Sequence, residues 1–154
     1  MSDPAASQIA RAGDTVAIAS DHAGFELKEA LKTDLTAMGF KVLDLGTTGP
    51  ASVDYPDFGK ALGQAVADGR AKAGVAVCGS GIGISIAANR IPGARAALVH
   101  DDTTAALSRE HNDANIIALG ARLTPVAQAR SALKTFFATA FGGGRHAGRV
   151  AKLG

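Results

Sequence analysis

The chain has 154 residues and a net charge of +2, with 47% hydrophobic and 19% charged residues. This length suits one domain, and this balance is typical of a globular protein rather than a disordered one. So small a charge gives no indication of nucleic-acid binding. No apolar run approaches the roughly 20 residues that span a bilayer. The single cysteine, Cys78, excludes an internal disulfide framework and favours a reducing compartment, which predicts a cytoplasmic protein.

The two ends of the chain differ in character from its middle. The first residues lack the apolar core of a signal peptide, and we interpret 1–13 as a mobile N-terminal tail. We expect 14–154 to form a single domain. Within it, three consecutive glycines at 142–144 precede a short basic C-terminal segment, 145–153.

Between the ends, short apolar runs alternate with amphipathic runs. The strands are predicted at 15–20, 40–46, 73–79, 94–100 and 115–120. The helices are predicted at 24–39, 55–70, 82–91, 102–112 and 124–143, with Asp101 or Asp102 capping the fourth and Thr124-Pro125 opening the fifth. The run at 15–20, TVAIAS, lacks polar alternation, which is typical of a strand buried on both faces. Five βα units therefore predict a parallel sheet covered by helices on both sides.

Polar residues follow the predicted strands at their carboxyl ends. They are Asp21-His22, Gly46-Thr47, Cys78-Gly79, His100-Asp101 and Gly120-Ala121-Arg122. Ligands of open parallel sheets bind beyond the carboxyl ends of the strands. Because these ends meet at one edge, the sequence predicts a binding site there.

The stretch CGSGIGISIAANR (78–90) carries three alternating glycines between a strand and a helix. Free N–H groups at a helix start favour an anion. The stretch lacks the Lys-Ser/Thr ending of a Walker A loop, and Ile84 stands where a dinucleotide fingerprint has its third glycine. Asp101 does lie at about the distance where a carboxylate holds a ribose. Nucleotide binding and a simple packing turn thus both stay alternatives.

Cys78 is open to two interpretations. A lone cysteine at the end of an apolar strand is commonly an inert core residue. Here the cysteine also precedes a helix N-terminus, where the dipole and free N–H groups stabilise a thiolate that can act as nucleophile or base. A hydrolase elbow does not fit, because Ser80 falls one place too early for G-x-S-x-G.

Other polar residues are likewise open to both a structural and a functional interpretation. Asp21 and His22 fit a pair of turn residues whose hydrogen bonds are satisfied within the turn. His111 fits a histidine that interacts with the dipole at a helix C-terminus. Arg145 and Arg149 are four apart, so on a helix they share one face, either as a solvated basic stripe or as a clamp on a phosphate. No His, Cys or Asp cluster has the spacing of a metal site.

Five stretches together resemble the ribose-5-phosphate isomerase B family, which includes galactose-6-phosphate isomerase subunits. They are SDHAGFELK (20–28), DYPDF (54–58), CGSGIGISIAANR (78–90), SREHNDANIIALGAR (108–122) and GGRHAGRV (143–150), in matching order. The resemblance implies a Rossmann-like three-layer αβα sandwich with a five-stranded parallel sheet. It also implies no metal or other cofactor, and a homodimer or dimer of dimers with active sites shared between subunits.

The resemblance further implies an aldose–ketose isomerase of the pentose phosphate pathway. Such an enzyme interconverts ribose 5-phosphate and ribulose 5-phosphate through an enediolate. Cys78 is then the base, Ser80 shuttles protons between the substrate oxygens in place of the more usual threonine, and His111 opens the sugar ring. The other implied site residues are the enediolate-stabilising loop Gly79, Gly81, Ile82 and Gly83, the substrate ligands Asp21, His22, Tyr55 and Asn112, and the phosphate ligands His22, Arg122, Arg145 and Arg149.

Two questions stay open at this level. The family also includes enzymes for allose 6-, galactose 6- and tetrose 4-phosphates, and specificity differences are expected near His100 and the loop 46–55. Some members replace the cysteine by a glutamate a few residues later, but GISIAAN here contains no acid. A different class of protein is the alternative to an enzyme: a non-catalytic module that binds sugar phosphates or nucleotides. A small-molecule sugar phosphate is the expected partner, and neither nucleic acid nor a membrane is.

Overall fold

The computed structural model describes residues 8–154, which form a five-stranded parallel sheet between two layers of helices. The strands are β1 (Thr15–Ser20), β2 (Lys41–Asp44), β3 (Ala73–Cys78), β4 (Ala96–Leu98) and β5 (Ile116–Gly120), in the order β2-β1-β3-β5-β4. The helices are α1 (Phe25–Ala37), α2 (Tyr55–Ala67), α3 (Ile82–Asn89), α4 (Asp102–Glu110), α5 (Val126–Ala138) and α6 (Arg145–Ala151). The predicted αβα sandwich is confirmed.

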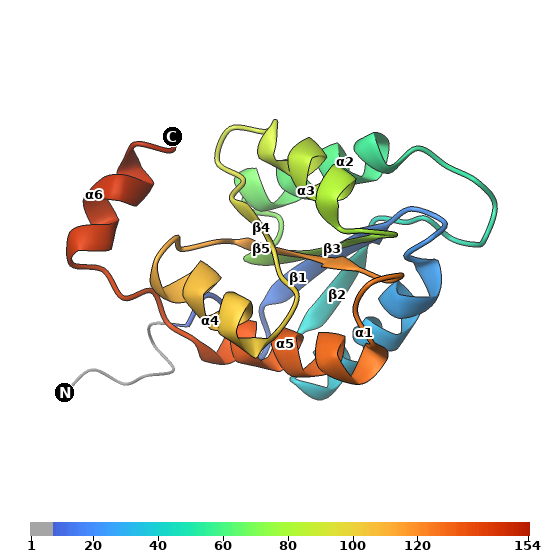
Figure 1. Cartoon of the computed structure of the whole chain (residues 1–154), viewed down its shortest axis with the longest axis horizontal. Helices are drawn as coiled ribbons and strands as arrows, with labels where there is room; N and C mark the ends of the chain where they lie inside the picture. Colours follow the sequence, from blue (N-terminus) through green and yellow to red (C-terminus); the bar gives the residue numbers. More distant parts are fainter. Residues whose placement is uncertain (1–7) are drawn as a thin grey trace.

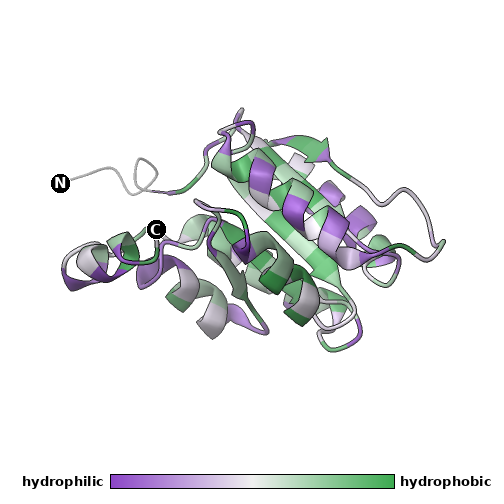
Figure 2. Ribbon diagram, turned by 90° about the horizontal axis from the view of Figure 1, so that it is seen from above, coloured by the Kyte–Doolittle hydropathy of each residue, from purple (hydrophilic) through white to green (hydrophobic). Residues whose placement is uncertain are grey.

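Helices α2 and α3 cover one face of the sheet, and α1, α4 and α5 cover the other (Figure 1). Strand β1 serves both layers, because Val16 and Ile18 enter the core under α1 and α5 while Ala17 and Ala19 face α2 and α3. Figure 2 shows hydrophobic strands through the middle of the domain and helices that combine hydrophobic and hydrophilic residues. Burial on both faces explains why β1, β3 and β5 lack polar alternation, whereas the edge strand β2 is only partly buried.

The central strands create a crevice at their carboxyl ends. Strands β1 and β3 are neighbours, but the helices that follow them, α1 and α3, cover opposite faces of the sheet. In open α/β sheets such a switch point is where ligands bind. The register pairs Ser20 with Val77, and Cys78 with Gly120. The ends of β1, β3 and β5 therefore lie side by side.

Helix α5 differs from its prediction at both ends. Pro125, predicted as the first helical residue, is instead the N-cap with ψ 147°, and this extended conformation delays the helix to Val126. The helix ends at Ala138 rather than at 143, because Thr139 is extended with φ −101° and ψ 125°. The choice of caps for α4 is settled in favour of Asp101, whose side chain accepts from the N–H of Thr104.

The basic segment contains α6, a seven-residue helix without a buried residue, which stands apart from the sandwich (Figure 1). Residues 1–7 of the predicted tail lie outside the described residues. In the remainder of that tail Ala10 is 3% exposed and belongs to the same core cluster as Phe40. The domain boundary after residue 13 stays a prediction. No helix within residues 8–154 is both long and apolar enough to cross a membrane.

Candidate active site

A cavity of about 630 Å³ lies at the carboxyl ends of β1, β3 and β5. It is lined by Asp21, His22, Ala23, Tyr55, Cys78, Gly79, Ser80, Ile82, Gly83, Ile86, Arg122 and Leu123. The residues predicted after strands one, three and five thus do meet, together with Tyr55 from the start of α2. Gly81 is buried within the same loop.

Cys78 lines this cavity although it is only 4% exposed. Its Sγ accepts a hydrogen bond from the N–H of Gly81 at 3.1 Å. Gly81 is the N-cap of α3 and has φ 79°, a left-handed conformation that favours glycine. A Cβ at this position would also lie 2.7 Å from Cδ1 of Leu98. The sulfur thus has a backbone hydrogen-bond donor at the N-terminus of α3.

The rest of the loop is held by Ser80 and Tyr55. The N–H of Ile82 donates to Oγ of Ser80 at 3.1 Å, so the hydroxyl hydrogen of Ser80 is left for another acceptor. The ring of Tyr55 lies directly on Gly83, since a Cβ there would be 2.5 Å from Cε1 of the tyrosine. A side chain at Gly83 would displace this ring from the cavity wall.

Asp21 and His22 are oriented by backbone hydrogen bonds. One carboxylate oxygen of the buried Asp21 accepts from the N–H of Gly24 at 3.0 Å, and the other is left for a ligand. Nδ1 of His22 accepts from the N–H of Val53 at 3.2 Å. An accepting Nδ1 leaves the proton of a neutral imidazole on Nε2. Asp21 can therefore accept from substrate hydroxyls, and His22 can donate to an anion.

Arg122 brings a positive charge to the loop. Its backbone N–H donates to the carbonyl of Gly79 at 2.9 Å, and its Nη1 would lie 3.2 Å from a Cβ at Gly79. The guanidinium thus lies against the residue that follows Cys78. A cation beside the thiol and the backbone N–H groups of the loop can stabilise negative charge that develops there.

The remaining predicted residues gather elsewhere in the chain. His111, Asn112 and Arg149 line a second cavity of about 280 Å³ with His146, Val150 and Leu153. The rings of His111 and His146 stack with their centroids 4.4 Å apart and an interplanar angle of 18°. This second cavity shares no lining residue with the cavity at Cys78.

The course of α4 explains this separation. The helix starts beyond the carboxyl end of β4 and runs back along the sheet, rising about 1.5 Å per residue over its nine residues. His111, its C-cap, therefore lies at the opposite end from Cys78. Figure 1 shows α6 and the end of α4 at the side of the domain away from the tip of β3. A single chain does not bring His111, Asn112, Arg145 and Arg149 to the thiol.

Positive groups outnumber negative ones around the second cavity. Burial lowers the pKa of His146, and the nearby positive charges of His111, Arg145 and Arg149 lower it further, whereas the carboxylate of Glu110 opposes them. Repulsion between these groups is relieved by a bound anion. The surroundings therefore suit a phosphate.

Other polar groups of the predicted edge lie outside both cavities. The Asp101 carboxylate accepts from the N–H and the hydroxyl of Thr104, both at 2.8 Å, and the backbone bond holds the pKa of Asp101 below its usual range. Asp101 caps α4 through Oδ1 and lines neither cavity, so it does not face a ligand bound at Cys78. Thr47, which follows a cis peptide bond, and the exposed His100 line neither cavity. In residues 8–154, no group of three or more His, Cys, Asp or Glu is placed to hold a metal.

The sequence interpretation missed an apolar rim on the cavity at Cys78. Ile82, Ile86 and Leu123 are 49%, 56% and 62% exposed and line it. The spacing of Ile82 and Ile86 places both on one face of α3. That spacing was a readable signal, but spacing alone does not tell an exposed face from a core face.

The fold and this edge define the class: a Rossmann-like α/β domain with its reactive groups at the carboxyl ends of parallel strands. The family model described as Ribose/Galactose Isomerase matches residues 16–153. The chain belongs to this family of isomerases, and its resemblance to ribose-5-phosphate isomerase B is confirmed.

Individual relatives agree with this assignment. Ribose-5-phosphate isomerase B of Escherichia coli (strain K12) is 38% identical over 88% of this chain and 91% of its own length. A putative sugar phosphate isomerase of Bacillus subtilis (strain 168) is 42% identical over 90% of this chain and 93% of its own. The solved ribose-5-phosphate isomerase B of Clostridium thermocellum superposes with a TM-score of 0.90 at 48% identity, covering 91% of this chain and 95% of that one. The type B enzyme of Trypanosoma brucei gives 0.89 at 42% identity, covering 92% and 97%.

Proposed function

We propose that the chain interconverts ribose 5-phosphate and ribulose 5-phosphate through an enediolate. The observation that carries the proposal is the hydrogen bond from Gly81 to Sγ of Cys78, in a cavity that also contains Asp21, His22 and Arg122. An isomerase needs a base of this kind beside donors for a transient anion. Relatives named ribose-5-phosphate isomerase B support the choice of substrate.

The chemistry is a transfer of two protons. The Cys78 thiolate takes the proton from C2 of the open-chain aldose. The released electron pair forms the C1–C2 double bond, and the π pair of C1=O1 moves onto O1, which gives the enediolate. Ser80 carries a proton from O2 to O1, and the Cys78 thiol returns its proton to C1, which gives the ketose. The N–H groups of Gly81 and Ile82 already bind Sγ and Oγ. Gly83, in the first turn of α3, has no intrahelical acceptor, so its N–H suits the enediolate oxygen.

We further propose a homodimer, alone or as half of a dimer of dimers, in which each active site contains residues of both subunits. Two observations support it: His111 lies far from Cys78 within one chain, and the cavity at Cys78 is rimmed by exposed apolar side chains. The end of α4 and α6 of one subunit then complete the cavity of the other. His111 opens the sugar ring there, and Asn112 binds substrate hydroxyls.

The phosphate and hydroxyl ligands follow from this arrangement. Asp21 accepts from substrate hydroxyls and Tyr55 lines the site. The groups proposed to bind the phosphate are His22, Arg122, Arg145 and Arg149. No cofactor is needed, because the moving groups are protons on carbon and oxygen. A free thiol as the sole cysteine fits a reducing compartment, for which we propose the cytoplasm.

The test is a panel of initial rates with ribose 5-phosphate, allose 6-phosphate, galactose 6-phosphate and erythrose 4-phosphate. We expect the highest kcat/KM with ribose 5-phosphate. Arg149→Ala should raise KM for the phosphorylated sugar by at least about tenfold, whereas Arg130→Ala, at an exposed ion pair with Asp34, should not. Preference for another sugar phosphate favours the alternative substrate within the family. Binding without turnover of any of the four favours a non-catalytic sensor and overturns the enzymatic proposal.

A further inference from the structure

We infer that Arg109 is a positioning residue for the ring-opening half of the active site, an inference that rests on the proposed function. Arg109 is 1% exposed, which is unusual for an arginine, and lies two residues before His111. It lines neither of the two cavities of the candidate site. Any effect on the reaction must therefore pass through other residues.

Three hydrogen bonds show what Arg109 holds. Its Nη1 donates to Oδ1 of Asp113 at 2.8 Å and to the carbonyl of Ala114 at 2.7 Å. Its Nε donates to the carbonyl of Thr139 at 3.3 Å, and the guanidinium carbon lies 5.7 Å from the ring centroid of Phe136. One buried side chain thus joins the turn after α4 to the end of α5.

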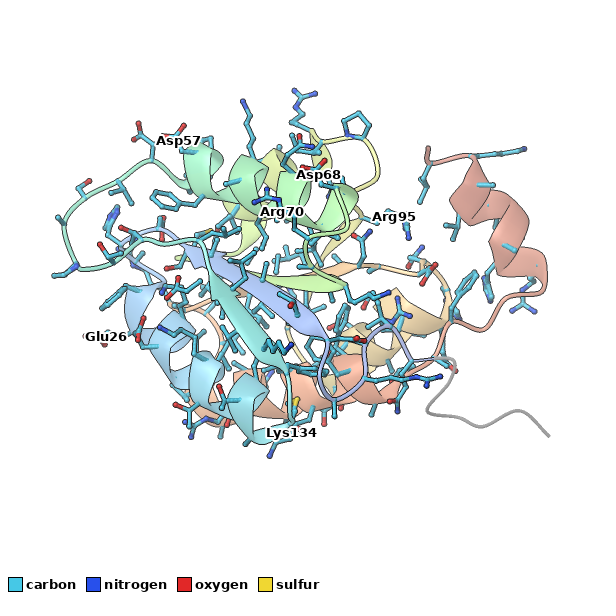
Figure 3. All side chains as sticks on the ribbon, turned by 180° about the vertical axis from the view of Figure 1, so that it is seen from behind. Glu26, Asp57, Asp68, Arg70, Arg95 and Lys134 are labelled. Atoms are coloured by element: carbon cyan, nitrogen blue, oxygen red, sulfur yellow. The ribbon has the colours of Figure 1, made fainter. Side chains whose placement is uncertain are left out.

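The turn itself depends on Asp113. This residue has φ 46°, a left-handed conformation that is uncommon outside glycine. Arg95 supports it from the other side: its Nε donates to the carbonyl of Asp113 at 3.0 Å, and its Nη2 lies 3.5 Å from Oδ2. Figure 3 shows Arg95 on the side of the domain that faces α6. Together the two arginines fix the turn that begins at His111.

The same links fasten the chain that leads to α6. Thr139 is the C-cap of α5, and the N–H of Gly142 donates to the carbonyl of Glu110 at 3.0 Å. Helix α6 has no buried residue, so within one chain its position relative to α4 depends on these links and on the stack of His111 with His146. Arg109 therefore sets the spacing between the ring-opening His111 and the phosphate-binding Arg149.

Hydrogen exchange tests the link without reference to activity. In Arg109→Lys, which keeps the charge but not the branched set of donors, we expect faster exchange in 111–115 and in α6, with β1 and β3 unchanged. Arg130→Lys, in an exposed ion pair of α5, is the matched control and should change neither region. Asp113→Asn is the second variant, because asparagine tolerates the left-handed conformation, and it should show the same pattern.

Kinetics in both directions tests the role. Ribose 5-phosphate exists mainly as a ring, whereas ribulose 5-phosphate stays open because its O5 is phosphorylated. In Arg109→Lys we expect kcat from ribose 5-phosphate to fall at least about tenfold and kcat from ribulose 5-phosphate to stay within about threefold. The open-chain aldose released in the second direction closes in solution. KM should rise in both directions, because α6 carries Arg145 and Arg149.

A double-mutant cycle separates positioning from a general loss of structure. If Arg109 acts on ring opening through His111, the variant Arg109→Lys/His111→Asn should have a kcat for ribose 5-phosphate within about twofold of that of His111→Asn alone. Three results would overturn the inference. The effects of the two substitutions on kcat could multiply in the double variant, kcat of Arg109→Lys could fall equally in both directions, or hydrogen exchange in α6 could stay unchanged. If the wild type does not isomerise any sugar phosphate, the proposed function fails. Hydrogen exchange still tests the link by itself: faster exchange of α6 in Arg109→Lys shows that Arg109 holds this helix, and unchanged exchange shows that it does not.

Discussion

The N–H of Gly81 and the sulfur of Cys78 are 3.1 Å apart, joined by a hydrogen bond from the residue that caps α3. From this amide the left-handed conformation of Gly81, with φ 79°, leads the chain into α3. A thiol at a strand end and an amide at a helix start thus become one functional unit. The proposed base depends on this unit rather than on the cysteine alone.

Replacing Gly81 by alanine tests the unit. The left-handed backbone is strained with a side chain, and the new Cβ would lie 2.9 Å from the carbonyl carbon of Leu119. We expect kcat/KM for ribose 5-phosphate to fall by about 10²-fold or more as the amide leaves the sulfur. Gly69→Ala is the matched control, because Gly69 has φ 78° and open space around it. A similar loss in both variants would mean that only backbone strain matters.

A mixing experiment tests the shared site. Cys78→Ala and His111→Asn each disable one half of the active site. If the two halves of a site come from different subunits, a heterodimer of the two variants contains one complete site. Coexpression at equal amounts should restore about a quarter of the wild-type rate, since statistical pairing makes half of the dimers mixed. No recovery above the two parent variants would place both halves in one chain and contradict the proposal.

His146 provides a spectroscopic probe of the proposed phosphate site. Burial and the charges of His111, Arg145 and Arg149 hold the pKa of His146 below the ordinary 6.5, so the ring is neutral at pH 7. Removing a charge with Arg149→Ala should raise this pKa, and so should a bound phosphate that offsets the charges. An NMR titration of the imidazole with and without inorganic phosphate measures both. A midpoint at or above 6.5 in the free protein, or one that phosphate leaves unchanged, would contradict this assignment.

Asp44 predicts a pH dependence of folding stability. Burial by itself would raise the pKa of Asp44, but hydrogen bonds from Lys28, Lys32 and the N–H of Gly46 outweigh it and hold the pKa below the ordinary 3.8. Lys28 is fully buried, and its Nζ lies 2.7 Å from the carboxylate. A carboxyl whose pKa is lower in the folded state stabilises the fold above its unfolded pKa, and this stability is lost as the pH falls through the folded value.

Asp44→Asn should therefore reduce the free energy of unfolding by about 1–3 kcal/mol at pH 7. The difference from wild type should begin to shrink as the pH falls below the ordinary 3.8, and it should be lost only below the lowered folded pKa, where the wild-type carboxyl is also neutral. Urea unfolding at several pH values measures this. Asp68→Asn is the control, because Asp68 is exposed and 3.9 Å from Arg70, and its effect should be near zero at every pH. A pH-independent loss in Asp44→Asn would show that its charge is not the cause.

Most of the fold could be predicted from local sequence patterns. The apolar runs located all five strands, and the spacing of Arg145 and Arg149 agrees with α6. The ends of α5 were less predictable, because Thr139 leaves the helix while its carbonyl accepts from Arg109, thirty residues away. The helix propensities of the local residues give no information about a contact so distant in the sequence.

The site was predictable in its residues but not in its arrangement. Cys78, Asp21 and Arg122 follow adjacent central strands, so topology alone brings them to one edge. His111 follows a helix that runs back along the sheet, and only the three-dimensional course of that helix shows that it ends far from the thiol. A role for Arg109 could not be predicted from the sequence, because its partners at 113, 114 and 139 are assembled only in the fold.

The most direct test of the central proposal is the initial rate at which ribose 5-phosphate is converted to ribulose 5-phosphate by the wild type and by Cys78→Ala. Alanine removes the sulfur but keeps the small apolar volume at the end of β3, so the fold should survive. We predict measurable turnover by the wild type and a loss of about 10³-fold or more in the variant. A wild type without turnover, or a Cys78→Ala variant within a few-fold of it, would contradict the proposal.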